Sequence, residues 1–283
     1  MKYSSDEALI AHIFGSGIQI PPQPGILIEI VKLLEKPNNN LVAIGNLINK
    51  DVSLTAAILR MLKSPRYRMA AQTVSMSKAI AILGMGQITN LIKGLSLRKV
   101  LSGQEVAFDK FWERSVEIAE LSAIIAEKQI SACNIAPEQA YMAGLFHDCG
   151  VPLLMQRFPD YCGEFRLNSR SGWPGYTEED KRFSTDHAVV GYLVARHWEL
   201  PDFICQAVRY HHDALRVDHA ALTLVSILQT ASHLHARLHQ LTNSEWSKIG
   251  KQALEEIGVD DSDPDFFYEE VLDSYNHHDE SKG

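Results

Sequence analysis

Runs of basic residues, long apolar stretches and an apolar leader are all missing from this sequence. The 283 residues carry a net charge of −8 and contain no run of lysines or arginines, which argues against a nucleic-acid partner because phosphate binding needs clustered cations. No apolar stretch approaches the ~20 residues that cross a bilayer, and residues 1–7 lack the basic start and apolar core of a signal peptide. We therefore expect a cytoplasmic protein with neither a nucleic-acid nor a membrane partner.

Closely spaced cysteines are also missing. The four cysteines, Cys133, Cys149, Cys162 and Cys205, stand far apart, and no pair has the Cys-x-x-Cys spacing. This pattern argues against a zinc knuckle and against a disulfide framework. It favours reduced, mostly buried thiols.

Patterns typical of β-strands are missing as well. We find no convincing run of alternating β-branched residues, whereas almost every periodic segment repeats with helical spacing. The sequence therefore predicts an all-α fold. The best internal boundary is Ser102-Gly103-Gln104, which separates an N-terminal helical bundle, residues 1–104, from a second helical part, residues 105–283. Because this linker is so short, we expect the two parts to pack as one rigid unit.

Histidines and an aspartate stand at predicted helix ends in the second part. These candidate metal ligands are His147, Asp148, His187, His211 and His212. Sequence neighbours do not share a helix face, so His147 and Asp148 converge on one ion only where the backbone leaves helical geometry, and Gly150 allows such a departure. Imidazoles with a carboxylate are the ligand set expected for Mn, Fe, Ni or Zn. Any one histidine alone is compatible with a buried structural role, His212 most of all, but the set together favours a metal site.

His187 stands at the N-terminus of a predicted helix that either Thr185 or Asp186 can cap. The helix dipole disfavours a protonated imidazole at this end. We therefore expect His187 to be neutral and able to donate a lone pair to a metal.

Short motifs occur in a fixed order between about residues 18 and 238. They read IPPQP at 20–24, INKDVSLT at 48–55, LKSP at 62–65, AIAILG at 79–84, FWERS at 111–115, AGLFHD at 143–148, DHAVVG at 186–191 and YHH at 210–212. With these motifs the sequence resembles the HD superfamily of metal-dependent phosphohydrolases and, more closely, its HDOD branch, the HD-related output domain of bacterial signalling proteins. The resemblance implies an HD-like helical fold with an additional N-terminal helical bundle.

Two positions depart from the pattern of active HD enzymes. Arg114 stands where those relatives have a metal-binding histidine, and Ser232 stands approximately where they have a metal-binding aspartate. The resemblance thus implies that the first of two metal ions would keep only His147 and Asp148. The ligands left for the second ion would be Asp148, His187, His211 and His212. We therefore expect one divalent metal (Mn, Fe, Ni, Zn or Mg) or none.

Arg114 is predicted, from its position, to place its guanidinium in the space of the missing first ion and to pair with Asp148. A buried carboxylate needs a partner, and arginine stays protonated where lysine can lose its proton. The alternative is an outward orientation toward Glu117 or the solvent, which long cationic side chains readily adopt.

Two functions are compatible with these features. Without ligands for the first ion, the site loses part of the charge neutralisation and water activation that two metal ions supply. This loss favours a non-catalytic regulatory module that acts on a signalling protein or binds a small-molecule ligand. The alternative is a phosphohydrolase that cleaves phosphate mono- or diesters with one metal ion.

Overall fold

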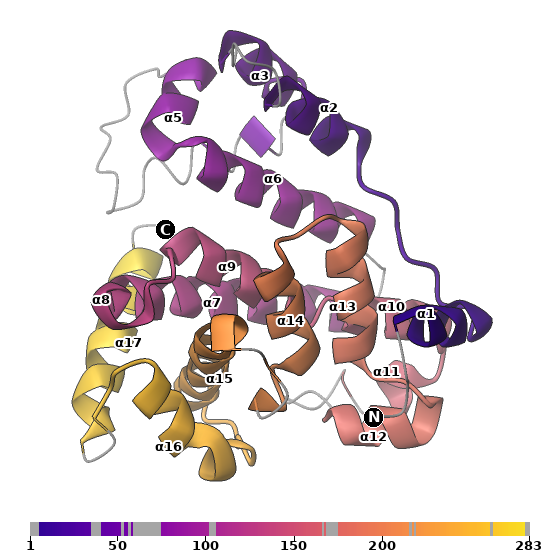
Figure 1. Ribbon diagram of the computed structural model, residues 1–283, viewed down its shortest axis with the longest axis vertical. Helices are drawn as coiled ribbons and strands as arrows, with labels where there is room; N and C mark the ends of the chain where they lie inside the picture. The colour runs from indigo at the N-terminus through magenta and orange to yellow at the C-terminus, as the bar shows by residue number, and fades with distance from the viewer. Residues whose placement is uncertain are drawn as a thin grey trace. The chain divides into compact units, whose positions relative to one another are not determined.

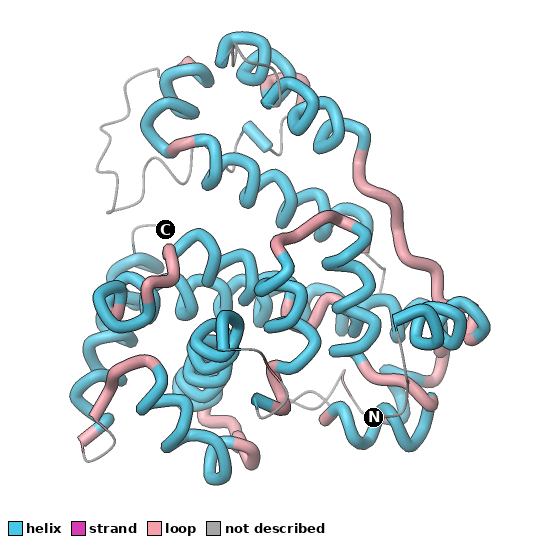
Figure 2. Tube along the Cα trace, in the orientation of Figure 1, coloured by secondary structure: helices cyan, strands magenta, loops and turns pink. Residues whose placement is uncertain are grey.

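The computed structural model describes residues 6–34, 41–51, 54, 55, 58, 75–101, 106–165, 167, 175–214, 217, 219–260 and 263–280. Every regular element within these residues is a helix (Figure 2), and the predicted all-α fold is confirmed. The proposed linker, residues 102–104, lies outside the described part of the chain. None of the described helices combines the length and the apolar character that a bilayer crossing requires.

Contacts along the chain divide it into two compact units. The larger unit comprises Met1–Pro22 and Leu101–Leu272, and the smaller unit comprises Gln23–Val100 and Asp273–Gly283. This division differs from the predicted one at both ends of the chain, because residues 1–22 group with the larger unit and 273–283 with the smaller one. That the two units pack as one rigid body stays a prediction.

The smaller unit is built from short helices. Its described helices are α2 (Gly25–Leu34), α3 (Leu41–Ile48), α5 (Met76–Leu83) and α6 (Met85–Val100), together with the end of α17 (Figure 1). Both α2 and α5 pack against α3 and α6. The hydroxyl of Ser75 accepts a hydrogen bond from the backbone N–H of Lys78 and so caps α5. Gly84, with a φ of +81°, makes the turn into α6.

The larger unit carries all of the candidate ligands. Its described helices are α1 (Asp6–Gly15), α7 (Val106–Lys128), α8 (Ile130–Cys133), α9 (Pro137–Phe146), α10 (Gly150–Arg157), α11 (Tyr161–Glu164), α12 (Tyr176–Phe183), α13 (His187–His197), α14 (Asp202–Tyr210), α15 (His219–Leu238), α16 (Trp246–Glu256) and most of α17 (Pro264–Glu280). The helix α7 packs against α9 and α15, and α14 packs against α9, α13 and α15 (Figure 1). The ligand-bearing ends of α9, α13 and α14 are thereby held in one packed group.

The contact between α7 and α9 is unusually close because of Gly144. A Cβ at this position would lie 2.6 Å from the Cα of Ala119, which is a steric clash. Glycine has no Cβ and therefore fits here without moving either helix. Fully buried side chains of α7, including Phe111, Ile118 and Ile125, fill the core beside it. The end of α9 is therefore fixed against the helix that carries Arg114.

Long-range hydrogen bonds tie the N-terminal residues to the larger unit, and two of them involve Trp198 and Arg157. The indole N–H of the buried Trp198 donates to the carbonyl of Pro21 at 2.9 Å. The Nε of Arg157 donates to the carbonyl of Ser16 at 2.6 Å. These bonds explain why residues 1–22 do not group with the helices that follow them in sequence.

Candidate metal centre

The turn between α9 and α10 delivers Asp148. Helix α9 ends at Phe146 and α10 begins at Gly150, so the helix is interrupted at this point, as the sequence predicts. A Cβ on Gly150 would lie 2.1 Å from the carbonyl oxygen of His187 and 2.8 Å from the backbone nitrogen of Gly191. Glycine therefore permits α10 to approach α13, and this approach brings the first residue of α13, His187, beside Asp148.

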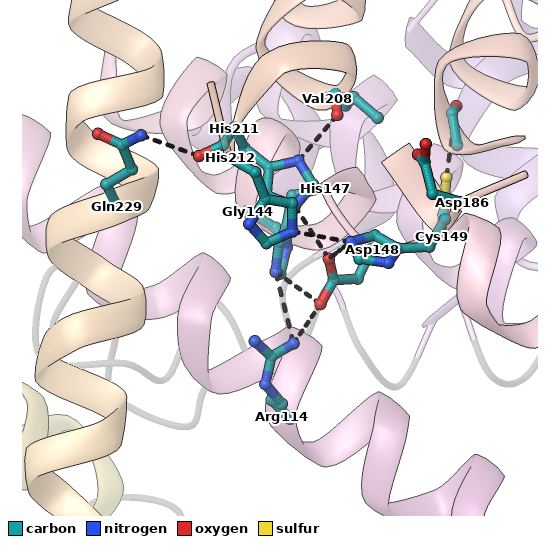
Figure 3. A network of polar contacts seen from close by, with 12 residues as sticks. Arg114, Gly144, His147, Asp148, Cys149, Asp186, Val208, His211, His212 and Gln229 are labelled. Carbon is teal, nitrogen blue, oxygen red and sulfur yellow. Dashed lines mark hydrogen bonds and ion pairs between the residues drawn. The ribbon is translucent and has the colours of Figure 1, made fainter. Parts of the chain in front are cut away.

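The two carboxylate oxygens of the buried Asp148 face different neighbours (Figure 3). Oδ1 lies 3.3 Å from Nε2 of His187 and 3.3 Å from Nε2 of His211. Oδ2 accepts a hydrogen bond from the guanidinium of Arg114 and lies 3.1 Å from Nε2 of His147. One carboxylate thus joins an imidazole cluster on one side to a fixed cation on the other.

All four imidazoles are anchored through Nδ1. The acceptors are the carbonyl of Gly144 for His147 (2.6 Å), the carboxylate of Glu179 for His187 (2.6 Å), the carbonyl of Val208 for His211 (2.8 Å) and the carboxylate of Glu245 for His212 (2.8 Å). Carbonyl and carboxylate oxygens only accept, so Nδ1 carries the proton and Nε2 keeps its lone pair in the neutral imidazole. Protein carboxylates and carbonyls orient metal-binding histidines in this way.

Glu179 and Glu245 support the centre, although the sequence pattern does not reveal them. Glu179 is fully buried on α12 and accepts hydrogen bonds from the backbone N–H of His187 at 2.8 Å and from the hydroxyl of Tyr161. In the sequence it belongs to the acidic run 178–180, where nothing distinguishes the buried residue from its exposed neighbour. Both glutamates meet their histidines only through the tertiary fold.

The protonation of His187 is set by its carboxylate neighbours. Burial alone would lower its pKa, but the charges of Glu179 and Asp148 raise the pKa of His187 to about 9. The expectation that the helix dipole keeps His187 neutral is therefore wrong, because a buried carboxylate in direct contact outweighs the dipole. Of the two candidate caps, Asp186 caps α13 by accepting from the N–H of Val189 at 2.8 Å. A cation that binds His187 has to displace a proton.

Asp148 is ionised and His211 is neutral. Burial opposes the ionisation of Asp148, but His147 and Arg114 overcome it and hold the pKa of this carboxyl well below its usual range. Burial, together with the neighbouring His212, lowers the pKa of His211 to about 4. The centre therefore offers an anionic oxygen and a neutral imidazole, the states that metal ligation needs.

The donor atoms fit a divalent transition metal. Four of the five predicted ligands place their ligand atoms within 4.8 Å of one another: Asp148, His187, His211 and His212. Nε2 of His211 is buried and makes no hydrogen bond, and it points into this group. Three imidazole nitrogens and one carboxylate oxygen suit Mn, Fe, Ni or Zn, whereas Mg prefers oxygen ligands. The fifth predicted ligand, His147, lies outside the group, with its Nε2 3.5 Å from Nη1 of Arg114.

Of the two altered positions, Arg114 lies on the side of Asp148 that faces His147. Arg114 pairs with Asp148 there, so the prediction for its orientation is confirmed and the alternative, toward Glu117 or the solvent, is set aside. Ser232 lies on α15 and is partly buried, and its hydroxyl brings no negative charge to a cation. This side of the centre therefore holds an arginine and a histidine where a first ion would need anionic ligands.

Comparison with known proteins identifies the family. The family model described as the HDOD domain matches residues 20–214, and the chain belongs to this family. An uncharacterised protein of Treponema pallidum is 23% identical over 214 residues, which are 75% of this chain and 41% of that protein. The chain thus spans less than half the length of this relative.

Solved structures share the fold. A protein of Shewanella amazonensis, provisionally assigned as a metal-dependent phosphohydrolase, matches with a TM-score of 0.72 at 14% identity, over 98% of this chain and 99% of that one. A protein of Marinobacter aquaeolei, provisionally assigned to signal transduction, matches with a TM-score of 0.68 at 20% identity, over 93% of this chain and 59% of that one. At such identities the likeness shows an HDOD-type helical fold.

Proposed function

We propose that this HDOD protein is a non-catalytic, cytoplasmic regulatory component of a signalling system, and that its centre holds at most one divalent metal. The observation that carries the proposal is the ion pair between Arg114 and Asp148. A guanidinium has only donors and no open coordination position, so it neutralises the carboxylate without activating water. The pair therefore replaces a reactive cation by an unreactive one.

The loss of ligands for a first ion also supports this function. Two-metal hydrolases stabilise both the attacking and the leaving oxygen of the phosphoryl group, and removing one ion removes much of that stabilisation. At this side of the centre only His147 and Oδ2 of Asp148 remain, and both contact Arg114. Ser232 supplies no carboxylate. The remaining group is suited to binding rather than to hydrolysis.

A metal in the remaining group would link the turn after α9 to the start of α13 and to the end of α14, through Asp148, His187 and His211. In a regulatory protein such a link stabilises one arrangement of these helices. The proposed partner is a signalling protein that contacts their surface, or a small-molecule ligand. The assignment of the Marinobacter protein to signal transduction agrees with this role.

A second candidate function is a phosphohydrolase that cleaves phosphate mono- or diesters with one metal ion. The three anchored imidazoles of His187, His211 and His212 favour this function, because their ligand atoms lie together with a carboxylate oxygen of Asp148. A bound metal would supply charge neutralisation for a phosphoryl oxygen. The chain's own contribution would be the fixed orientation of these imidazoles by Glu179 and Glu245.

Metal content and phosphoesterase activity distinguish the two functions. Protein purified without chelator is analysed for metals and assayed on phosphate mono- and diesters with Mn²⁺, Mg²⁺ or Ni²⁺. The matched control is a His187→Ala, His211→Ala double variant whose folding is verified by circular dichroism. We expect at most one equivalent of metal in this centre, less in the double variant, and no turnover above that of the variant. Metal-dependent turnover that disappears in the double variant would establish the hydrolase instead.

A further inference from the structure

A second group of metal-binding side chains lies between α7 and the end of α15, apart from the centre around Asp148. Oε2 of Glu117 lies 3.1 Å from Nε2 of His235 and 2.6 Å from Nε2 of His239. The ligand atoms of these three residues all lie within 4.8 Å of one another. His235 and His239 are four residues apart, so a helix places their rings on one face, and their ring centroids are 4.6 Å apart.

The set matches the ligands of zinc. Two imidazole nitrogens and one carboxylate oxygen are a combination that holds Zn²⁺ and leaves a fourth position open to water. In a tetrahedral site with bonds of ~2.0 Å, the ligand atoms stand ~3.3 Å apart. The observed separations from Glu117, 3.1 and 2.6 Å, have to increase by ~0.2 and ~0.7 Å to reach this geometry. Rotation of the exposed His239 side chain supplies that movement.

The end of α15 favours a cation at this place. The backbone N–H of His239 donates to the carbonyl of His235 at 3.1 Å, and the N–H of Leu241 donates to the carbonyl of Ala236 at 2.7 Å. Gln240, with a φ of +53°, ends the helix in the left-handed conformation. The C-terminal end of a helix carries a partial negative charge that stabilises positive charge. A zinc ion at this place would be stabilised by the partial negative charge at the C-terminal end of α15.

The charges around the group are compatible with a metal. Burial would raise the pKa of Glu117, but hydrogen bonds from His235 and His239 lower it below its usual value, so the carboxylate is ionised at neutral pH. The nearby guanidinium of Arg114 is engaged by Asp148, and that of Arg237 by Asp265. The group is open to solvent, because the Glu117 and His239 side chains are 25% and 42% exposed.

We propose that Glu117, His235 and His239 form a zinc site that is separate from the centre around Asp148 and that joins α7 to the end of α15. Hydrogen bonds alone would hold the two helices together without metal, and the two cases make different predictions. A zinc site requires that all three residues contribute to affinity and that Zn²⁺ stabilises the protein through them. Hydrogen bonding alone requires neither.

Titration calorimetry of the full chain with Zn²⁺, after chelator treatment and dialysis, tests the proposal. Variants His239→Ala and Glu117→Gln remove one ligand each, from an exposed and a partly buried position, and His277→Ala removes an exposed histidine of α17 as the matched control. We expect the wild-type protein and His277→Ala to bind one equivalent more than His239→Ala, and Glu117→Gln to bind that equivalent at least tenfold more weakly. Equal stoichiometry and affinity in all four proteins would overturn the proposal.

Thermal unfolding and Co²⁺ absorption provide independent readouts. With Zn²⁺ present, the Tm of the wild-type protein should rise further than that of His239→Ala, whereas without metal the two proteins should differ little. Bound Co²⁺ should give visible bands that lose intensity in His239→Ala and persist in a His187→Ala, His211→Ala variant, which lacks the other centre. If the bands depend only on His187 and His211, the group around Glu117 binds no metal.

Discussion

Replacing Gly150 by alanine should damage both the stability of the larger unit and its candidate metal centre. The added Cβ would lie 2.1 Å from the carbonyl oxygen of His187 and 2.8 Å from the backbone nitrogen of Gly191, whereas ordinary contacts begin at 3.4 Å. Both neighbours are backbone atoms of α13 and cannot rotate away. To accommodate the methyl group, α10 and α13 have to move apart.

The size of this movement sets the expected effect. Widening the contact from 2.1 Å to at least 3.4 Å displaces backbone, and overpacking of this kind costs ~3 kcal/mol, the upper part of the usual range. For a unit of this size that corresponds to a fall in Tm of roughly 6–12 °C. The same movement separates His187 from Asp148, whose ligand atoms are 3.3 Å apart. Metal sites tolerate shifts of only ~0.2 Å, so metal affinity should fall with stability.

Calorimetric unfolding and metal titration of Gly150→Ala measure the two effects. The matched control is Gly163→Ala on α11, where a Cβ meets nothing within 4 Å. Since alanine is the better helix former by up to ~1 kcal/mol, the control should keep or raise the Tm. A Gly150→Ala protein with the Tm and the metal affinity of the wild type would show that this backbone contact does not position His187.

Other substitutions test the surroundings of Asp148. Glu179→Gln keeps the shape of the side chain that orients His187 but removes its charge, so metal affinity should fall roughly 10–100-fold, and unchanged affinity by calorimetry would contradict this role. Arg114→Ala should lower the free energy of unfolding by ~2 kcal/mol in denaturant titrations, because it leaves the buried carboxylate without its fixed cation. The expected loss is smaller than for a fully buried pair, because the Arg114 side chain is one-fifth exposed. Equal stability of the variant and the wild type would show that the pair contributes no net stability. Arg114→His combined with Ser232→Asp should add up to one equivalent of metal by elemental analysis, and a folded double variant without added metal would argue against these positions as the cause of ligand loss.

Much of the candidate centre could be predicted because its candidate ligands stand at helix ends, and helix ends are local features. Pro137 begins α9, the Asp186 side chain caps α13, and the glycine at 150 follows the interrupted helix. These signals depend on a few neighbouring residues. The joint occurrence of these histidines and Asp148 at helix ends, together with the resemblance to the HD superfamily, predicted that they belong to one group.

The supporting residues could not be predicted because their roles depend on how separate helices pack against one another. Glu179 acts on His187 from another helix, and Glu245 meets His212 across 33 residues of sequence. The grouping of residues 1–22 with the larger unit likewise depends on Trp198 and its bond to Pro21, which are 177 residues apart. An acidic residue in a polar helix or a proline in an extended segment gives no local sign of such a partner.

The divided environment of Asp148 explains how the fold accommodates a buried carboxylate at this position. A buried carboxylate without a cation would be strongly destabilising, since its desolvation is not compensated. Arg114 compensates Oδ2 with a charge that the chain itself carries, so folding no longer needs a metal at that side. Oδ1 stays oriented toward His187 and His211, and the bond from the Gln229 side chain to the carbonyl of His211 (2.9 Å) holds the end of α14 in place (Figure 3). The arginine thus neutralises the carboxylate, which the fold requires, but it cannot activate water as a metal ion would.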